Sequence, residues 1–233
     1  MPTTPQEYPR PTAPNSVDIP AGDGPGPKTP FAARTDLQPN TVYHVEGRGD
    51  FYTDSNGKVT YVETTYGGRG NLNADLMTPH PDTTYVVHPE VNTPSDGSSQ
   101  AHVFHTDAEG RVDLAHTDQL SLGEADRSES VQTRGGDEGG VGYDGGHLFG
   151  NGFGGGGEYS NIVAMLRDVN RGSGDSFFNL ENQWRDLLKT DASTKIEVDI
   201  RPHYSGDSRV PEAIEINYSV NGGELVTKVF LNE

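Results

Sequence analysis

Apolar and polar positions alternate in two stretches of the N-terminal half. In 41–65, apolar or aromatic residues stand on both sides of an Asn56-Gly57 pair, and 102–117 repeats the same Asp-x-x-Gly design (HVFHTDAEGRVDLAHT). Alternation with period two is typical of half-buried strands, and Asn-Gly is a strong hairpin-turn signal. The pattern predicts two similar β-hairpins, joined by an irregular connection around 67–82.

The C-terminal half combines two helical patterns with further strands. Apolar residues recur at helical spacing in 160–172 (SNIVAMLRDVNRG) and 175–190 (DSFFNLENQWRDLLKT). The stretches 193–206 and 213–232 alternate as strands, and an Asn-Gly turn makes the latter a hairpin. The predicted class is α+β: N-terminal antiparallel hairpins, a core of one strand, a glycine-rich His turn and two helices, and C-terminal antiparallel strands.

Composition divides the chain into three parts. Residues 1–30 hold 9 of the 16 prolines and few apolar residues, which favours a disordered linker over a packed core. Residues 31–130 are rich in hairpins and form either the N-terminal part of the main domain or a small separate module. Residues 131–233 form the predicted core.

The formal net charge of -18 argues against a protein that holds nucleic acid through a broad basic face. Residues 1–140 carry 9 basic and 21 acidic side chains, and residues 141–233 carry 8 and 14, so neither part is basic. A hydrolase needs only a local electropositive pocket, which a divalent cation and a few arginines supply. Any nucleic-acid binding is therefore expected to be weak and salt-dependent.

Cysteine is absent, so disulfides and thiolate metal sites are excluded, and any metal must be held by oxygen or imidazole ligands. No apolar run approaches the roughly 18 residues of a membrane helix, and no apolar signal region follows Met1. We expect no membrane partner and, for an exported protein, a route without an ordinary signal peptide. His102, His105 and His116 are expected to be surface side chains of a hairpin rather than metal ligands.

The segment 135–157 contains 13 glycines in 23 positions, a density that argues against a helix or a regular strand interior. A flexible linker is one interpretation. The embedded apolar and aromatic residues favour an ordered turn instead, because a solvated linker has no need of them. Within this turn, His147 is a residue type that accepts a proton near neutral pH, and amide or carboxylate oxygens follow within about 35 residues. Phosphodiester hydrolysis needs such a base and a hard cation, and Mg²⁺ takes only one or two protein oxygens.

Four short motifs occur in order: Asp144-Gly-Gly-His147-Leu, Asn161-Ile-Val, Asp-Val-Asn170-Arg, and Asn-Leu-Glu181-Asn-Gln-Trp. This order resembles the DNA/RNA non-specific endonucleases of the ββα-metal (His-Me finger) group, whose signature is D-R-G-H, two Asn nine residues apart and a later Glu. The GHLxGxxFGG stretch is most similar to the bacterial polymorphic-toxin branch. The resemblance covers roughly 133–233.

The resemblance implies a role for each matched residue. His147 would be the general base that activates water, and Asn170 would be the direct ligand of Mg²⁺ or another divalent cation such as Mn²⁺. Asn161 would support the site, and Glu181 would hold a metal-bound water. Asp144 is expected to orient the turn through hydrogen bonds to backbone amides.

One position departs from the family motif, because Gly145 stands where the family usually has a phosphate-binding arginine. Candidate replacements are Arg127, Arg134, Arg167 and Arg171. Arg127 and Arg134 are favoured, because they precede the His turn on a segment that resembles the family's preceding strand.

The expected function is thus metal-dependent, sequence-nonspecific hydrolysis of DNA and/or RNA. The toxin branch further implies a secreted interbacterial effector that acts in the target-cell cytoplasm and is neutralised by an immunity protein. Two other interpretations stay open: an acidic secreted binding module, and an inactive relative of the nucleases.

Overall fold

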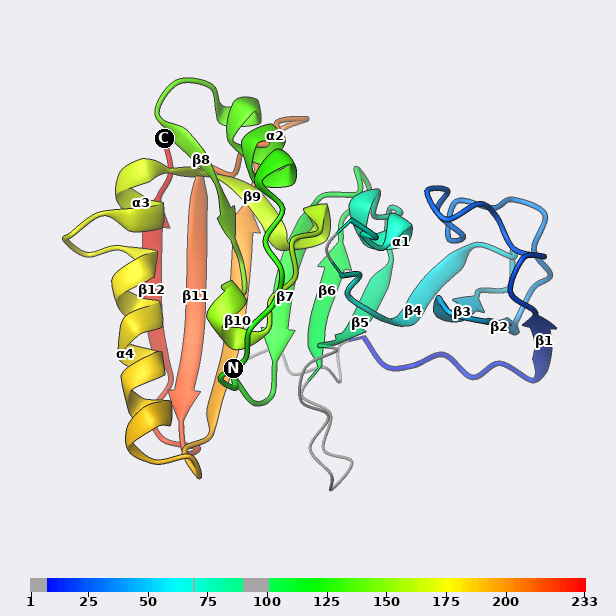
Figure 1. Ribbon diagram of the computed structural model, residues 1–233, viewed down its shortest axis with the longest axis horizontal. Helices are drawn as coiled ribbons and strands as arrows, with labels where there is room; N and C mark the ends of the chain where they lie inside the picture. Colours follow the sequence, from blue (N-terminus) through cyan, green and yellow to red (C-terminus); the bar gives the residue numbers. More distant parts are fainter. Residues whose placement is uncertain (1–7, 69, 90–100) are drawn as a thin grey trace.

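One mixed sheet extends across the whole molecule in the computed structural model, which describes residues 8–68, 70–89 and 101–233 (Figure 1). Its strands are arranged in chain order from β1 to β7, followed by β10, β11 and β12. The ten strands are β1 (Asn15–Ile19), β2 (Thr41–Val45), β3 (Gly49–Thr53), β4 (Val59–Thr65), β5 (Thr84–His88), β6 (His102–Thr106), β7 (Val112–Thr117), β10 (Ile196–His203), β11 (Ala213–Val220) and β12 (Val226–Leu231).

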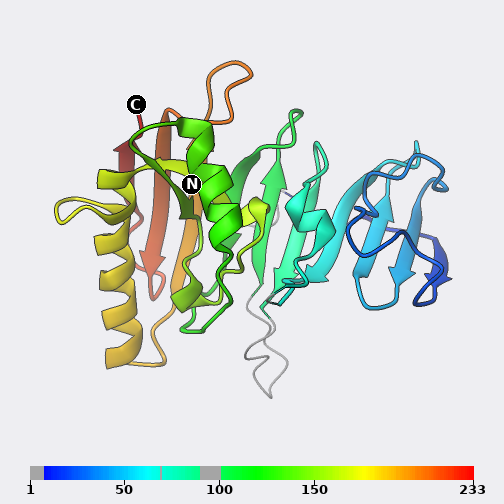
Figure 2. The same ribbon diagram turned by 45° about the horizontal axis from the view of Figure 1, so that its top comes forward.

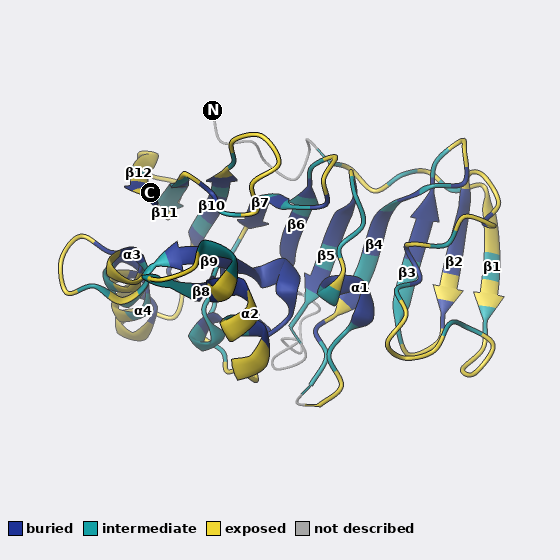
Figure 3. Ribbon diagram, turned by 90° about the horizontal axis from the view of Figure 1, so that it is seen from above, coloured by how far each residue is buried: buried dark blue, intermediate teal, exposed yellow. Residues whose placement is uncertain are grey.

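All the helices lie on one face of this sheet, as Figures 2 and 3 show. Together with a two-stranded sheet, β8 paired with β9, they form a second layer, which is thickest over the β7–β12 end. The members of this layer are α1 (Ala74–Met77), α2 (Glu129–Gly139), β8 (Tyr143–His147), β9 (Ile162–Leu166), α3 (Arg167–Arg171) and α4 (Phe177–Thr190). The predicted α+β class is confirmed, and sheet predominates over helix.

The three predicted hairpins form at β3–β4, β6–β7 and β11–β12. The carboxylate of Asp54 accepts hydrogen bonds from two backbone amides of the first turn, and Asp107 does the same in the second. In the third turn, Asn221 and Gly222 have φ of 52° and 67°, the left-handed geometry that Asn and Gly tolerate best. The repeated Asp-x-x-Gly pattern is therefore a turn-forming device.

Two parts of the N-terminal half differ from the prediction. The segment 67–82 contains α1 and leads into β5, which the alternation did not reveal, and β5 pairs with β4 in parallel. Asn15–Ile19, expected within a disordered linker, forms β1 and pairs in parallel with β2. Arg10 also pairs with Glu63 on β4. Interstrand hydrogen bonds and this ion pair compensate for the low apolar content of the segment.

The helix predicted over 160–172 is wrong in its first half, where Ile162–Leu166 forms strand β9. Only Arg167–Arg171 is helical, as α3. Four of the five β9 residues are buried, so the strand is a continuous apolar run that periodicity alone does not distinguish from a buried helix. The helix predicted at 175–190 is confirmed as α4, although its N-cap is Ser176, whose hydroxyl accepts a hydrogen bond from the Asn179 amide.

The glycine-rich segment 135–157 is also more regular than predicted. It contains the end of α2, all of β8 and one short 3-10 helix (Asn151–Phe153), and its last five residues, 153–157, are all buried. Glycines in this segment allow backbones to approach: a Cβ on Gly136 of α2 would lie 3.0 Å from the amide nitrogen of Gly145 on β8. A flexible linker does not fit this arrangement.

Residues before and after position 130 share the large sheet, because β7 pairs with β10 in antiparallel fashion. At this junction His116 stands opposite Asp199, with 2.5 Å between Nδ1 and Oδ1, and its side chain is 1% exposed. His102 is likewise 2% exposed, hydrogen-bonded to the Tyr66 hydroxyl and stacked on Phe149. The prediction that these two histidines lie on the surface is wrong, because each side chain has a polar partner inside the protein.

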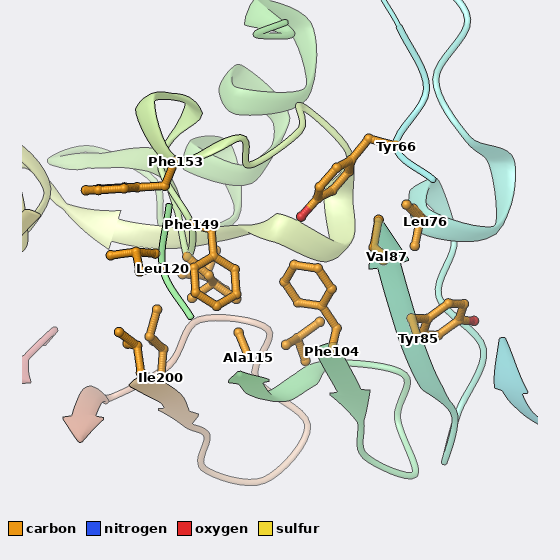
Figure 4. Close-up of a cluster of buried hydrophobic side chains, with 14 of the residues drawn as sticks. Tyr66, Leu76, Tyr85, Val87, Phe104, Ala115, Leu120, Phe149, Phe153 and Ile200 are labelled. Atoms are coloured by element: carbon orange, nitrogen blue, oxygen red, sulfur yellow. The ribbon is translucent and has the colours of Figure 1, made fainter. Parts of the chain in front are cut away.

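The main core lies between the sheet and the layer above it (Figure 4). Phe149, from the segment after β8, packs edge-on against Phe104 of β6, with 5.9 Å between ring centroids. Trp184 of α4 makes similar edge contacts with Phe153 and Phe177. Aromatic pairs of this kind stabilise by ~1 kcal/mol beyond the area that they bury. Among the described residues, no helix has the length and apolar character needed to cross a membrane.

Burial of His102 makes stability depend on pH. Burial lowers the pKa of this imidazole to about 3, so between pH 6.5 and 3 the unfolded chain binds a proton that the folded protein does not. The contribution is fully present above pH 6.5 and is lost as pH falls towards 3. Through this residue, the native protein is expected to lose up to ~1.4 kcal/mol of unfolding free energy for each pH unit below 6.5. His102→Gln, which keeps a hydrogen-bonding group for Tyr66, is expected to lack this loss.

Urea unfolding of native protein and His102→Gln at pH 7 and pH 5 measures this difference. His203→Gln is the matched control, because His203 is exposed on β10. Equal pH dependence in native protein and His102→Gln would contradict the assignment.

Candidate active site

His147 is positioned by the two-stranded sheet. It is the last residue of β8 and pairs with Ile162, the first residue of β9, and α3 follows β9 directly. The chain turns from β9 into α3 at Leu166, whose amide donates a hydrogen bond to the Asn232 side chain. Strand, strand and helix thus surround one end of a cavity.

The cavity has a volume of about 670 Å³ and gathers seven of the nine residues that the sequence indicated as site residues. Its walls come from α2, from β8, from α3 and from the first turns of α4. The seven residues are Arg127, Asp144, His147, Asn170, Arg167, Arg171 and Glu181. Segments more than 50 residues apart in the chain therefore meet at one place.

His147 has the properties of a base that stays neutral. Its Nε2 atom is buried and has no hydrogen-bond partner among the described residues. Burial lowers the pKa of the imidazole to about 4, with a smaller contribution from the positive charge of Arg127. At neutral pH the ring is therefore uncharged, and one ring nitrogen carries a lone pair that accepts a proton.

Glu181 approaches the same cavity from α4. Its Oε1 accepts a hydrogen bond from the Gly150 amide at 3.1 Å. Burial raises the pKa of Glu181 to about 7, and the charges of Arg185 and Arg127 partly offset this rise. A Cβ at Gly150 would lie 2.4 Å from Glu181 Oε1, so glycine is needed for the carboxylate to take this position.

Asp144, on β8, gathers three polar side chains of α3. It accepts a hydrogen bond from Asn170 Nδ2 at 3.3 Å and pairs with Arg167 and Arg171 at 3.2 and 2.8 Å. We expected this carboxylate to accept backbone amides of the turn, and that expectation is wrong. Because β9 leads straight into α3, the cationic side chains of α3 reach the carboxylate instead.

Asn161 lies behind the cavity rather than in its wall. The side chain is fully buried; its Oδ1 accepts a hydrogen bond from the Phe149 amide, and its Nδ2 donates to the carbonyls of Phe149 and Gly156, each at 2.9 Å. These three bonds tie together the two ends of the loop that follows His147. Asn161 thereby holds the backbone on which the base is mounted.

The two favoured arginines lie in different surroundings. Arg127, in the loop before α2, lines the cavity and donates to Asn151 Oδ1 at 2.7 Å. Arg134, on α2, does not line it, and its guanidinium lies over the ring of Tyr159 at 4.4 Å. Neither arginine is on a strand, contrary to our expectation.

The presence of glycine at position 145 has a structural cause. A Cβ at this position would lie 2.1 Å from the carbonyl oxygen of Gln132, because α2 packs directly on β8. Any larger residue, including the arginine of the family motif, requires α2 to move. In this chain, helix α2 occupies the space that the side chain of that arginine would need, and Arg127 lies in the loop just before this helix.

Sequence reasoning missed two contributors to the site. Arg185 lies one helical turn after Glu181, and its positive charge lowers the pKa of the Glu181 carboxyl group more than the charge of Arg127 does. The i, i+4 spacing of the two residues in the sequence could have indicated this contact. Helix α2 supplies Glu129, Gln132 and Thr133 to the cavity wall, and its glycine content concealed it.

The donor groups of the cavity fit a hard cation that keeps most of its water. The described residues contain no cluster of three or more His, Asp or Glu side chains able to hold a metal. Mg²⁺ needs only one or two protein oxygens, and Asn170 and Glu181 provide an amide and a carboxylate in the same cavity. These two oxygen donors therefore suit Mg²⁺, which keeps most of its waters, better than an ion that needs protein ligands on all sides.

Adding a small side chain at position 145 tests how tightly α2 packs on β8. Gly145→Ala is expected to lower the free energy of unfolding by ~1–3 kcal/mol, because the new methyl group meets backbone atoms that give way only if the helix shifts. Chemical denaturation measures this, and hydrogen exchange locates the loosening to α2. Gly174→Ala is the matched control, because a Cβ there meets nothing within 4 Å. Similar values for the two variants would show that the contact is not tight.

Comparison with known proteins yields relatives and structural neighbours that are nucleases or secretion-system proteins. The type VII secretion system protein EssD of Staphylococcus aureus (strain USA300) is 33% identical over 132 residues, which cover 55% of this chain and 21% of EssD. The chain thus matches only about a fifth of that relative's length.

Among solved structures, NucA from Streptococcus agalactiae with bound magnesium covers 63% of this chain and 78% of its own at 15% identity, with a TM-score of 0.41. The Sda1 nuclease with bound zinc covers 39% and 38% at 22% identity, with a TM-score of 0.35. The family model "DNA/RNA non-specific endonuclease" matches residues 91–222, which begin upstream of the resemblance seen in the sequence and include β6 and β7. Since this match spans more than half of the chain, the protein belongs to the DNA/RNA non-specific endonuclease family.

Proposed function

We propose that this chain hydrolyses phosphodiester bonds in DNA and/or RNA without sequence specificity, in a reaction that depends on Mg²⁺ or a similar divalent cation. The observation that carries the proposal is His147, which lines a cavity together with Asn170, Glu181 and Arg127 and whose buried Nε2 has no hydrogen-bond partner among the described residues. An acidic binding module has no use for such a base. Membership of the endonuclease family supplies the substrate class.

His147 would act as the general base. Its neutral imidazole takes a proton from a water molecule as the water oxygen attacks phosphorus, and the bond from phosphorus to the leaving oxygen then breaks while that oxygen takes a proton from a solvent water. The proton acquired by His147 is returned to solvent. A low pKa makes the imidazole a weak base, but it also keeps the ring ready to accept a proton at every pH above about 4.

The residues around His147 would bind and neutralise the phosphate. Asn170 would hold a divalent cation and Glu181 one of its bound waters, and the cation would supply positive charge that neutralises the phosphate. Arg127 would contact the phosphate in place of the missing motif arginine, and Arg171, which lines the same cavity, would be a second cation. Asp144 would be a positioning residue, since it holds Asn170 and both α3 arginines.

The similarity to EssD, a type VII secretion system protein, supports a link between this chain and secretion. We propose that the chain is the nuclease part of a secreted interbacterial toxin that acts in the cytoplasm of the target cell. A cognate immunity protein would protect the producer by covering the cavity. Substrate binding would be weak without the cation, because the net charge of -18 repels nucleic acid over most of the surface.

Removal of the base tests the proposed function directly. His147→Ala is expected to lower kcat on plasmid DNA and on RNA by at least about 10²-fold, the usual contribution of general-base catalysis. Cleavage is also expected to stop in EDTA and to return with Mg²⁺ or Mn²⁺. His203→Ala serves as control, because His203 is exposed on β10 and pairs with Glu215. Equal cleavage by native protein and His147→Ala would refute the assignment, and no cleavage by either would favour an inactive relative.

The two arginines near α2 provide a matched pair. Arg127→Ala is expected to lower kcat/KM by about 10²-fold, because it removes a donor aimed at the phosphate. Arg134→Ala removes the same charge from the same region but outside the cavity, and should change kcat/KM little. Steady-state cleavage of a fluorogenic oligonucleotide distinguishes the two. Equal losses would mean that Arg127 acts only through the overall charge.

A further inference from the structure

A second cavity lies directly beside the catalytic one. It has a volume of about 1080 Å³ and shares Arg127, Glu129 and Gln132 with the catalytic cavity as a common wall. We call it the flanking cavity. Its other wall comes from the N-terminal part of the chain, namely Pro27, Lys28 and the segment 70–77 that contains α1. Figure 3 shows α1 and α2 on the same face of the sheet.

The walls of the flanking cavity are held in place before any ligand arrives. The buried carboxylate of Glu158, which follows the glycine-rich turn, accepts hydrogen bonds from the amides of Gly67 and Asn73 at 2.6 and 3.2 Å. Leu72 and Met77 pack against a buried cluster of Val131, Tyr159 and Ile162. Cavities preformed in this way bind without the cost of ordering a loop.

The lining suits a nucleoside better than a phosphate. Lys28 and Arg127 are balanced by Asp126 and Glu129, so the formal charge of the lining is zero. The remaining surface combines apolar side chains, Leu72, Ala74 and Met77, with the amides of Asn71 and Gln132. Apolar surfaces accept the face of any base, while amides and carboxylates accept or donate hydrogen bonds at its edge.

We propose that the flanking cavity binds the nucleoside next to the scissile phosphate, so that the strand crosses Arg127 as it passes from one cavity to the other. This inference rests on the proposed nuclease function. Arg127 stands on the shared wall, where it reaches the phosphate that links the two positions. Predominantly apolar contacts would give this acidic protein affinity for a strand without a basic surface and without strong base preference.

Blocking the flanking cavity tests the proposal. Ser130 is exposed on α2 and lines this cavity but not the catalytic one, so Ser130→Trp fills it from a position outside the catalytic cavity. We expect KM for an oligonucleotide to rise by about tenfold, since contacts to one base contribute on this order. Hydrolysis of bis(p-nitrophenyl) phosphate, which lacks a base, should be unchanged. Ser193→Trp, at an exposed serine beyond α4, is the matched control.

A second readout does not require catalysis. An oligonucleotide carrying 5-iodouracil, irradiated with the protein in EDTA, is expected to crosslink to residues 70–77, and Ser130→Trp, whose new ring lies outside this segment, should abolish these crosslinks. Asn71→Ala, a milder change at an exposed wall residue, should weaken them.

The outcomes separate the two proposals. Unchanged oligonucleotide KM and undiminished crosslinks in Ser130→Trp would overturn the flanking site while leaving the nuclease function intact. Failure of the native protein to cleave either substrate would contradict the nuclease function, and crosslinking would still decide whether the flanking cavity binds a strand.

Discussion

The close contact between α2 and β8 determines how the site of this protein is built. Glycines on both sides, Gly136 and Gly145, let the helix backbone lie against the strand with no side chain between them. That approach places the start of α2, with Arg127, at the cavity of His147. It also removes the space for an arginine at position 145. The departure from the family motif and the new cation thus share one packing cause.

The site is supported from both halves of the chain. Phe149, two residues after His147, stacks on His102 of β6, and its backbone is held on both sides by Asn161. Glu158 ties the glycine-rich segment to the loop before α1. Because β7 and β10 also share a sheet, the hairpin region is structurally continuous with the catalytic layer. This agrees with a family match that begins at residue 91.

A nucleic-acid substrate fits the strongly acidic composition if a cation supplies positive charge at the site, because three arginines and four carboxylates line the catalytic cavity. Arg127, Arg167 and Arg171 all line the catalytic cavity, where Asp144 orients the last two. A divalent cation would add further positive charge at this place, since the family acts on polyanions. The proposed flanking cavity needs no net positive charge. Nucleic acid would then be attracted only at the catalytic cavity, and an acidic surface elsewhere would not prevent its binding.

Local patterns in the sequence determined the turns, the hairpins, helix α4 and the order of the site motifs. Asn-Gly pairs, period-two alternation and a capped amphipathic run depend on neighbouring residues, so they can be interpreted without the fold. Likewise, His147, Asn170 and Glu181 stood out by residue type and spacing, and all three line one cavity.

Tertiary structure decided the rest, because the deciding contacts join residues far apart in the chain. Pairing with β8 made Ile162–Leu166 a strand, although its apolar run equally suits a buried helix. Tyr66 and Asp199 provided the polar partners that allow His102 and His116 to be buried. The packing of α2 on β8 brought Arg127, and not Arg134, to the cavity. The role of the glycines in α2 depends on the strand that they contact, and the sequence does not show which strand that is.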